Sequence, residues 1–107
     1  MQNYLLLNDG SFFCGELINQ SKNILGKMIL NNEGNIVIKC QLTGKEKLIV
    51  NKKDNQTGYL TLSNVDFQGL KQKIKENKTL LGKIVTDSLP IEYHVYDLKT
   101  YIPANIA

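Results

Sequence analysis

The side chains that could carry out acid–base chemistry are few. His94 is the only histidine, and it lies between Tyr93 and Tyr96. An unperturbed imidazole titrates near neutral pH, so His94 could act as a general base. A pocket lined by Tyr93, His94 and Tyr96 would indicate a small-ligand site. No catalytic partner for His94 can be placed from the sequence, so a structural role for this histidine is the preferred interpretation.

The other reactive groups give no recognisable motif. Cys14 and Cys40 both occur in strand-like, apolar patterns, where a buried thiol behaves as a small hydrophobic side chain. The two cysteines and one histidine lack the spacing of a zinc site, and no glycine-rich phosphate loop is present. The acidic residues are too scattered to predict a catalytic carboxylate pair. We therefore expect no catalytic residue, no metal and no cofactor, and favour a protein that is not an enzyme.

All thirteen basic residues are lysines, and the formal net charge is +3. Lys71, Lys75 and Lys78 recur at helical spacing, and a second group of lysines surrounds the loop near residue 52. A basic helix face could follow phosphates on a nucleic acid or an anionic membrane. The alternative is a solvated face that keeps the domain soluble. Because the net charge is modest and no arginine is present, we do not expect nucleic-acid binding, although these three lysines remain candidate binding residues.

The first half of the chain has the pattern of paired strands. Strands are predicted near residues 3–7, 11–18, 24–30, 35–42, 46–51 and 57–62. Gly10 and Gly34 each follow an acidic residue between apolar runs, which predicts tight turns, at least one of them with a positive φ. Within 35–42, alternation predicts that Ile36, Ile38, Cys40 and Leu42 share a buried face. The expected arrangement is an antiparallel meander or a partly open barrel.

One amphipathic helix is predicted after residue 63. Ser63 and Asp66 have the spacing of a capping box, and Asn77 is a suitable end. The apolar stripe of this helix consists of Phe67, Leu70 and Ile74. Residues 91–98 are rich in β-branched and aromatic side chains and predict a last strand after Pro90. Residues 100–107 are interpreted as a C-terminal tail.

Two segments resemble known families. Asp9-Gly10-Ser11-Phe12-Phe13-Cys14-Gly15-Glu16-Leu17-Ile18-Asn19 resembles the core of a MORN repeat, which implies stacked hairpins that act as a scaffold or bind lipid headgroups. A second copy around residues 28–37 departs from this pattern, since it has Val37 for the aromatic residue and Lys39 for the glycine. The helix followed by Leu80-Leu81-Gly82-Lys83-Ile84 resembles the chorismate lyase family, with a leucine where that family has proline. The lyase reaction of that family depends on an arginine, which this chain lacks.

The sequence therefore predicts one α+β domain over residues 1–107, an antiparallel sheet or partly open barrel with one amphipathic helix. The expected function is a non-catalytic binding or protein-interaction module, with a protein partner or self-association. The alternative is a small-ligand-binding or lyase-type domain of chorismate-lyase-like fold. The N-terminus has no basic start followed by a long apolar stretch, and no run reaches transmembrane length, so we expect a cytoplasmic protein.

Overall fold

Two antiparallel hairpins begin the chain, as their turn sequences predict. β1 (Asn3–Leu7) pairs with β2 (Phe12–Leu17), and β3 (Ile24–Leu30) pairs with β4 (Ile36–Cys40). Gly10 and Gly34 have φ angles of 93° and 79°, so both predicted turn conformations are confirmed. In the first turn, the carboxylate of Asp9 accepts a hydrogen bond from the backbone N–H of Ser11.

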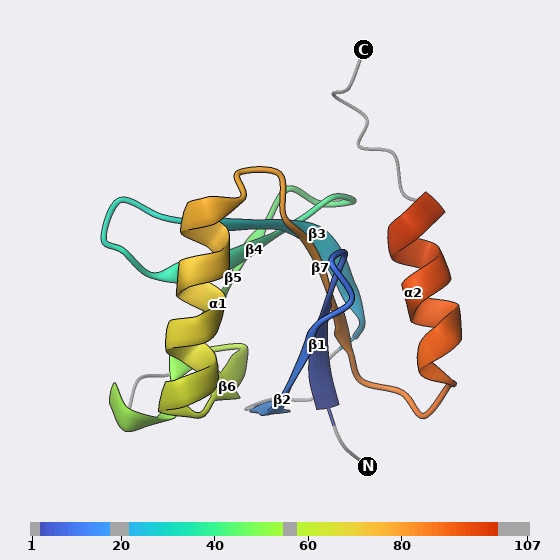
Figure 1. Ribbon diagram of the computed structural model, residues 1–107, viewed down its shortest axis with the longest axis horizontal. Helices are drawn as coiled ribbons and strands as arrows, with labels where there is room; N and C mark the ends of the chain where they lie inside the picture. Colours follow the sequence, from blue (N-terminus) through green and yellow to red (C-terminus); the bar gives the residue numbers. More distant parts are fainter. Residues whose placement is uncertain (1–2, 18–21, 55–57, 101–107) are drawn as a thin grey trace.

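The computed structural model describes residues 3–17, 22–54 and 58–100 (Figure 1). Its remaining elements are β5 (Glu46–Asn51), a 3-10 turn (Lys52–Asp54), β6 (Leu60–Leu62), α1 (Asn64–Glu76), β7 (Leu81–Val85) and α2 (Ile91–Thr100). The described strands close into a barrel in the order β1-β2-β6-β5-β4-β3-β7. The α+β class is thus confirmed. The closed sheet is consistent with the predicted barrel. The alternative, an antiparallel meander, is not formed, because β6 pairs parallel with β5 and antiparallel with β2.

Aliphatic side chains fill the barrel. Residues alternate along each strand, so that Leu5 and Leu7 point inward while Leu6 points outward. Gly82 also faces the interior, since a Cβ at this position would approach Met28 Sδ to 2.7 Å. The main core cluster consists of Leu5, Leu7, Ile24, Met28, Ile36, Ile38, Ile49, Leu60, Leu62, Phe67, Leu70, Ile74, Leu80 and Ile84. A seven-stranded barrel filled in this way leaves its ends, not its centre, for other molecules.

The predicted helix is α1, and it covers one end of the barrel. Ser63 is its N-cap and accepts a hydrogen bond from the Asp66 N–H, and Asn77 is its C-cap. The predicted stripe of Phe67, Leu70 and Ile74 is buried in the barrel core.

Three contacts place α1 at the end of the barrel that carries the two hairpin turns. Lys73 Nζ lies 2.9 Å from Asp9 Oδ2 in the first turn. Lys71 Nζ lies beside Gly34 in the second turn. Asn51, at the end of β5, donates a 2.7 Å hydrogen bond to Asn64 Oδ1 at the start of the helix.

Residues 91–98 form a helix, so the predicted last strand was wrong. α2 packs on the outside of the barrel against β1 and β7, on the side opposite α1 (Figure 1). His94 and Leu98 are its buried residues, and Ile91 and Val95 are half-buried. The spacing of these four residues is that of a helix stripe. The stripe covers the outward-facing side chains of Leu6 and Val85, which alternation leaves outside the barrel.

Two further predictions need correction. β4 ends at Cys40, and Leu42 lies in the following turn with 96% of its surface exposed, so it does not share the buried face of Ile36 and Ile38. The segment Leu81–Val85, which was not among the predicted strands, is β7 and closes the barrel between β1 and β3. The predicted tail, apart from residue 100, lies outside the described residues.

The position of α1 predicts different effects for two neighbouring substitutions. Ile74→Ala should lower the free energy of unfolding by about 2–4 kcal/mol, because it opens a cavity in the plugged end of the barrel. Lys75→Ala should change it by less than about 0.5 kcal/mol, because this side chain is exposed. Urea unfolding of the two variants measures both values, and equal losses would show that the helix stripe is assigned to the wrong side.

Candidate functional site

A cleft of about 760 Å³ lies at the end of the barrel opposite α1. It is formed where β3, β5 and β6 begin and where β4 ends, because all four strands reach the same end of the barrel. We call it the mouth cleft. Its lining consists of Lys22, Asn23, Ile24, Cys40, Leu42, Thr43, Lys45, Lys47 and Tyr59. This end of a barrel is a common position for ligand sites, and the cleft has the volume of one.

Tyr59 forms a fixed aromatic wall of the mouth cleft. Its hydroxyl donates a 2.9 Å hydrogen bond to the backbone carbonyl of Lys22. Lys47 Nζ lies 5.6 Å from the centroid of its ring, within the range of a cation–π contact. The ring is also packed against the edge of the barrel core. The Tyr59 side chain therefore links the segment at Lys22 to the start of β5 at Lys47, although the three residues are distant in the sequence.

Cys40 contributes a thiol whose environment favours the thiolate. A hydrogen bond from the Thr43 side chain, backbone hydrogen bonds and the ammonium group of Lys47 lower the pKa of this thiol, and these effects outweigh burial. The hydroxyl oxygen of Thr43 also accepts a hydrogen bond from the Lys45 N–H. The tight turn between β4 and β5 thus positions the Cys40 thiol close to Lys45 and Lys47. The expectation of a buried Cys40 was wrong, because this thiol is only partly buried and lies at the end of its strand.

A polar network ties the mouth cleft to α2. Asn23 donates a 2.8 Å hydrogen bond to Asp87 Oδ2, and its carbonyl oxygen accepts two hydrogen bonds from Thr86. Asp87 Oδ1 lies 3.0 Å from His94 Nε2 and accepts a hydrogen bond from the Leu89 N–H. The hydrogen bond from Asn23, followed by those from Leu89 and His94, lowers the pKa of Asp87, so the carboxylate is ionised at neutral pH.

His94 has a structural role in this network. Its side chain is only 2% exposed, and an ionised Asp87 requires Nε2 to carry the proton. Nδ1 is buried, and it has no hydrogen-bond partner among the described residues. A second tie holds α2 on the barrel: Lys83 Nζ on β7 lies 2.7 Å from Asp97 Oδ2. His94 is not a lining residue of the mouth cleft.

The structure separates the three candidate residues on α2. Tyr93 and Tyr96 are 60% and 66% exposed, whereas His94 faces the barrel. The three residues therefore do not line a common pocket, because a helix directs residues 93 and 96 away from residue 94.

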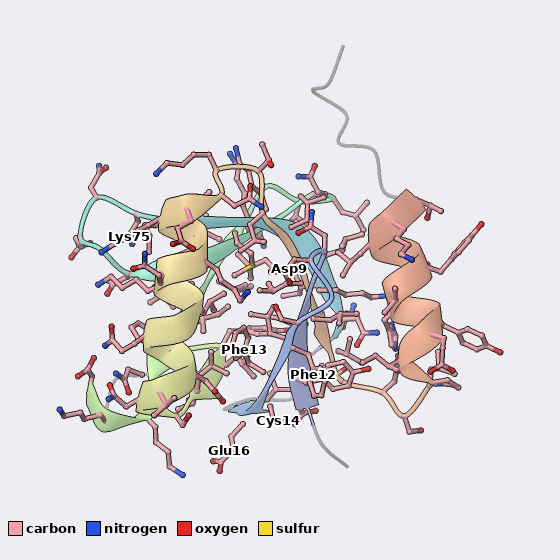
Figure 2. All side chains as sticks on the ribbon, in the orientation of Figure 1. Asp9, Phe12, Phe13, Cys14, Glu16 and Lys75 are labelled. Carbon is pink, nitrogen blue, oxygen red and sulfur yellow. The ribbon has the colours of Figure 1, made fainter. Side chains whose placement is uncertain are left out.

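The outer surface of β1 and β2 carries a second, shallower cleft of about 370 Å³. Phe12 and Phe13 lie on opposite sides of β2, with Phe13 against the core and Phe12 outside (Figure 2). The Phe12 ring meets Tyr4 edge to face, with centroids 6.0 Å apart. Cys14, Ser88 and Asp87 also line this cleft. Because the network with Asn23 and His94 already engages Asp87, the cleft offers a mainly apolar surface.

The three candidate lysines of the predicted basic face lie at the far end of the barrel from the mouth cleft. Lys71 is half-buried near the second hairpin turn, and Lys75 is exposed on α1 (Figure 2). Lys78 lies beyond the end of the helix, in a turn. They are therefore spread over the plugged end of the barrel.

The residues of the mouth cleft could be found only in part from the sequence. Lys45 and Lys47 belong to the second group of lysines, around the loop near residue 52, that the sequence analysis noted. Nothing in the sequence indicated that they lie next to Lys22, Cys40 and Tyr59. The available signal was the turn Thr43-Gly44-Lys45, where Gly44 has a φ of 72°. Lys52, another loop lysine, lies 3.6 Å from Glu16 outside the cleft.

Comparison with known proteins gives no matching family model, no matching curated protein and no matching solved structure. Within residues 3–17, 22–54 and 58–100, no three His, Cys, Asp or Glu side chains are grouped as metal ligands. Neither α1 nor α2 has the length and apolar character needed to cross a bilayer.

The environment of Cys40 predicts the pH at which its thiol begins to react with an alkylating reagent. In a Cys14→Ser background, the pH midpoint for reaction with iodoacetamide should fall below that of an ordinary thiol. Thr43→Val should raise this midpoint, because it removes the hydroxyl that stabilises the thiolate, and Thr43→Ser should retain it. A midpoint that is the same in all three proteins would show that the hydroxyl does not act on the thiol.

Proposed function

We propose that this protein is a non-catalytic binding module that binds a small molecule in its mouth cleft. The observation that carries the proposal is the difference between the two ends of the barrel. α1 fills one end with apolar side chains, whereas the opposite end holds a cleft lined by ammonium, thiol and phenol groups. A concave site with a few convergent polar groups is typical of ligand recognition.

The lining of the mouth cleft favours binding over catalysis. It contains no imidazole and no carboxylate among the described residues, and Asn23 uses its amide to hold Asp87 and Thr86. His94 is buried in a separate network under α2. We do not propose the lyase reaction, because the chain has no arginine to bind the substrate carboxylates. We also infer a cytoplasmic location, in keeping with the free thiol of Cys40.

A fragment screen by nuclear magnetic resonance tests this binding function. In ¹H–¹⁵N spectra, the amides shifted by bound fragments should belong to the residues around Ile24, Cys40 and Tyr59. Thr43→Trp, which places a bulky ring in the cleft from an exposed position of the turn, should abolish these shifts, and Leu89→Trp should leave them unchanged. Fragments that shift only amides of α2, or that bind the Thr43→Trp protein equally well, would contradict the proposal.

The second candidate is a protein-interaction module, and the exposed surface of α2 favours it. Tyr93 and Tyr96 lie one turn apart on the outer face of the helix, and both are more than half exposed. Tyrosine is enriched at the centres of protein interfaces because it offers a large rigid ring with a polar group. On this hypothesis, α2 presents the tyrosines to a protein partner or to a second copy of the chain.

Self-association through α2 is directly measurable. If the tyrosines form a dimer interface, sedimentation equilibrium should give a dimer that becomes a monomer in Tyr93→Ser/Tyr96→Ser. The double substitution should change the free energy of unfolding of the monomer by less than about 0.5 kcal/mol, because both side chains are exposed. A wild-type protein that stays monomeric at high concentration excludes the self-association form of this hypothesis.

A further inference from the structure

We propose that the mouth cleft takes a small organic anion that carries a planar ring, of the class of aryl phosphates and aryl carboxylates. This inference rests on the binding function proposed above and adds the chemical class of the ligand. Two features of the lining carry it: three lysines that have no carboxylate partner among the described residues, and a fixed aromatic wall. Both belong to the same cleft.

The charge of the cleft is one-sided. Lys22, Lys45 and Lys47 line it, and none of the aspartates and glutamates in the described part of the chain does so. Among the described residues, none of these three ammonium groups has a carboxylate within 4.0 Å, in contrast to Lys52, Lys73 and Lys83, which each have one.

Glu46, the acidic residue adjacent to Lys47 in the chain, does not line the mouth cleft, although it lines a smaller pocket of about 270 Å³ that shares Lys47 and Tyr59 with the cleft. Three cations around a concave surface raise the local concentration of anions, and they lose little by exchanging water for a ligand oxygen. The lining is therefore complementary to an anionic ligand.

The aromatic wall selects a ligand with a flat apolar part. The hydrogen bond to the Lys22 carbonyl fixes the hydroxyl end of the Tyr59 ring, so stacking on this ring costs little side-chain entropy. Ile24 supplies a neighbouring apolar surface, and Leu42 is an almost fully exposed aliphatic side chain at the rim. A planar ring placed between these side chains would remove apolar area from water while its anionic group meets the lysines.

The distribution of the other lysines favours a small ligand over a polyanion. Lys71 and Lys75 belong to α1, which covers the opposite end of the barrel, so the two groups of lysines do not line one site. Ammonium groups act as point charges and lack the bidentate geometry of guanidinium. The cleft is therefore suited to either phosphate or carboxylate, and the position of the ring supplies the remaining specificity.

The test is a titration of the ¹⁵N-labelled protein with phenyl phosphate, benzoate, the neutral analogue benzyl alcohol and inorganic phosphate. One of the two aryl anions should bind at least about tenfold more tightly than benzyl alcohol and than inorganic phosphate, because only the aryl anions use both the charge and the ring. The tighter of the two identifies the anionic group. Lys45→Gln/Lys47→Gln should weaken its binding about tenfold or more, while the matched control Lys75→Gln/Lys78→Gln should leave it unchanged.

The outcomes separate this inference from the binding function. Equal affinities for benzyl alcohol and the aryl anions in the cleft would overturn the anion class and leave the binding function standing. Inorganic phosphate that binds as tightly as phenyl phosphate would overturn the role of the ring. Shifts that are confined to the amides of α1, or that disappear in the control variant, would place the anion site at the other end of the barrel and overturn the inference. If no fragment and no aryl anion shifts the amide resonances of the cleft residues, both proposals fail.

Discussion

The packing of α1 on one end of the barrel determines the rest of the structure. A barrel of seven short strands has two ends at which its apolar interior would meet water. At one end, Phe67, Leu70 and Ile74 complete the core. The Lys73–Asp9 ion pair to the first hairpin turn and the hydrogen bond between Asn51 and Asn64 fix the position of the helix. Burial of three large apolar side chains is a stabilising contribution of several kcal/mol, on the order of 1.5–3 kcal/mol for each. The end opposite the helix is completed by longer polar side chains.

The difference between the ends explains the distribution of chemical groups. Inward-pointing positions at the plugged end are mostly apolar, and the polar one at the end of β5, Asn51, is bonded to Asn64 of α1. Those at the other end include Cys40 and Lys47, which continue the inward faces of β4 and β5. A lysine in this position extends its apolar stem along the core and its ammonium group toward the solvent. The strand alternation that fills the barrel therefore also places a thiol and a cation at the cleft.

α2 adds a separate layer, held by Lys83–Asp97 and by the network of Asn23, Asp87 and His94. Asn23 is the link between this layer and the cleft, because it lines the cleft and holds the segment that leads into α2. Histidine in this chain is thus used to attach a helix. The buried Nδ1 is a cost of that arrangement that the described residues leave uncompensated.

Local chemistry explains which elements the sequence could predict. The turns at Gly10 and Gly34 and the capped helix α1 follow from signals within a few residues, so they were predicted correctly. Residues 91–98 were assigned to a strand because their tyrosines, isoleucine and valine favour strands in general. Their helical stripe is complete only when His94 is counted as a buried residue, which depends on the partner Asp87.

Long-range pairing was not predictable in the same way. β7 is short and contains a glycine and a lysine, and its assignment depends on its two neighbours in the barrel. The mouth cleft is a product of the same closure, because it joins the ends of strands that are distant in the sequence. The sequence shows how many lysines there are and where they occur in the chain, but not that three of them line one cleft. The prediction that Tyr93, His94 and Tyr96 line one pocket assumed a strand. Because the segment is a helix, His94 faces the barrel and the two tyrosines face the solvent.

α1 plugs the barrel at one end, and we propose that the ligand site lies at the other. A crystal structure of the protein soaked with phenyl phosphate would show both ends at once. We expect a filled barrel, α1 packed on the hairpin turns, and density for the ring against Tyr59 with the phosphate near Lys45 and Lys47. Density for the ligand inside the barrel, on α1 or on α2, with the mouth cleft empty or closed, would contradict it.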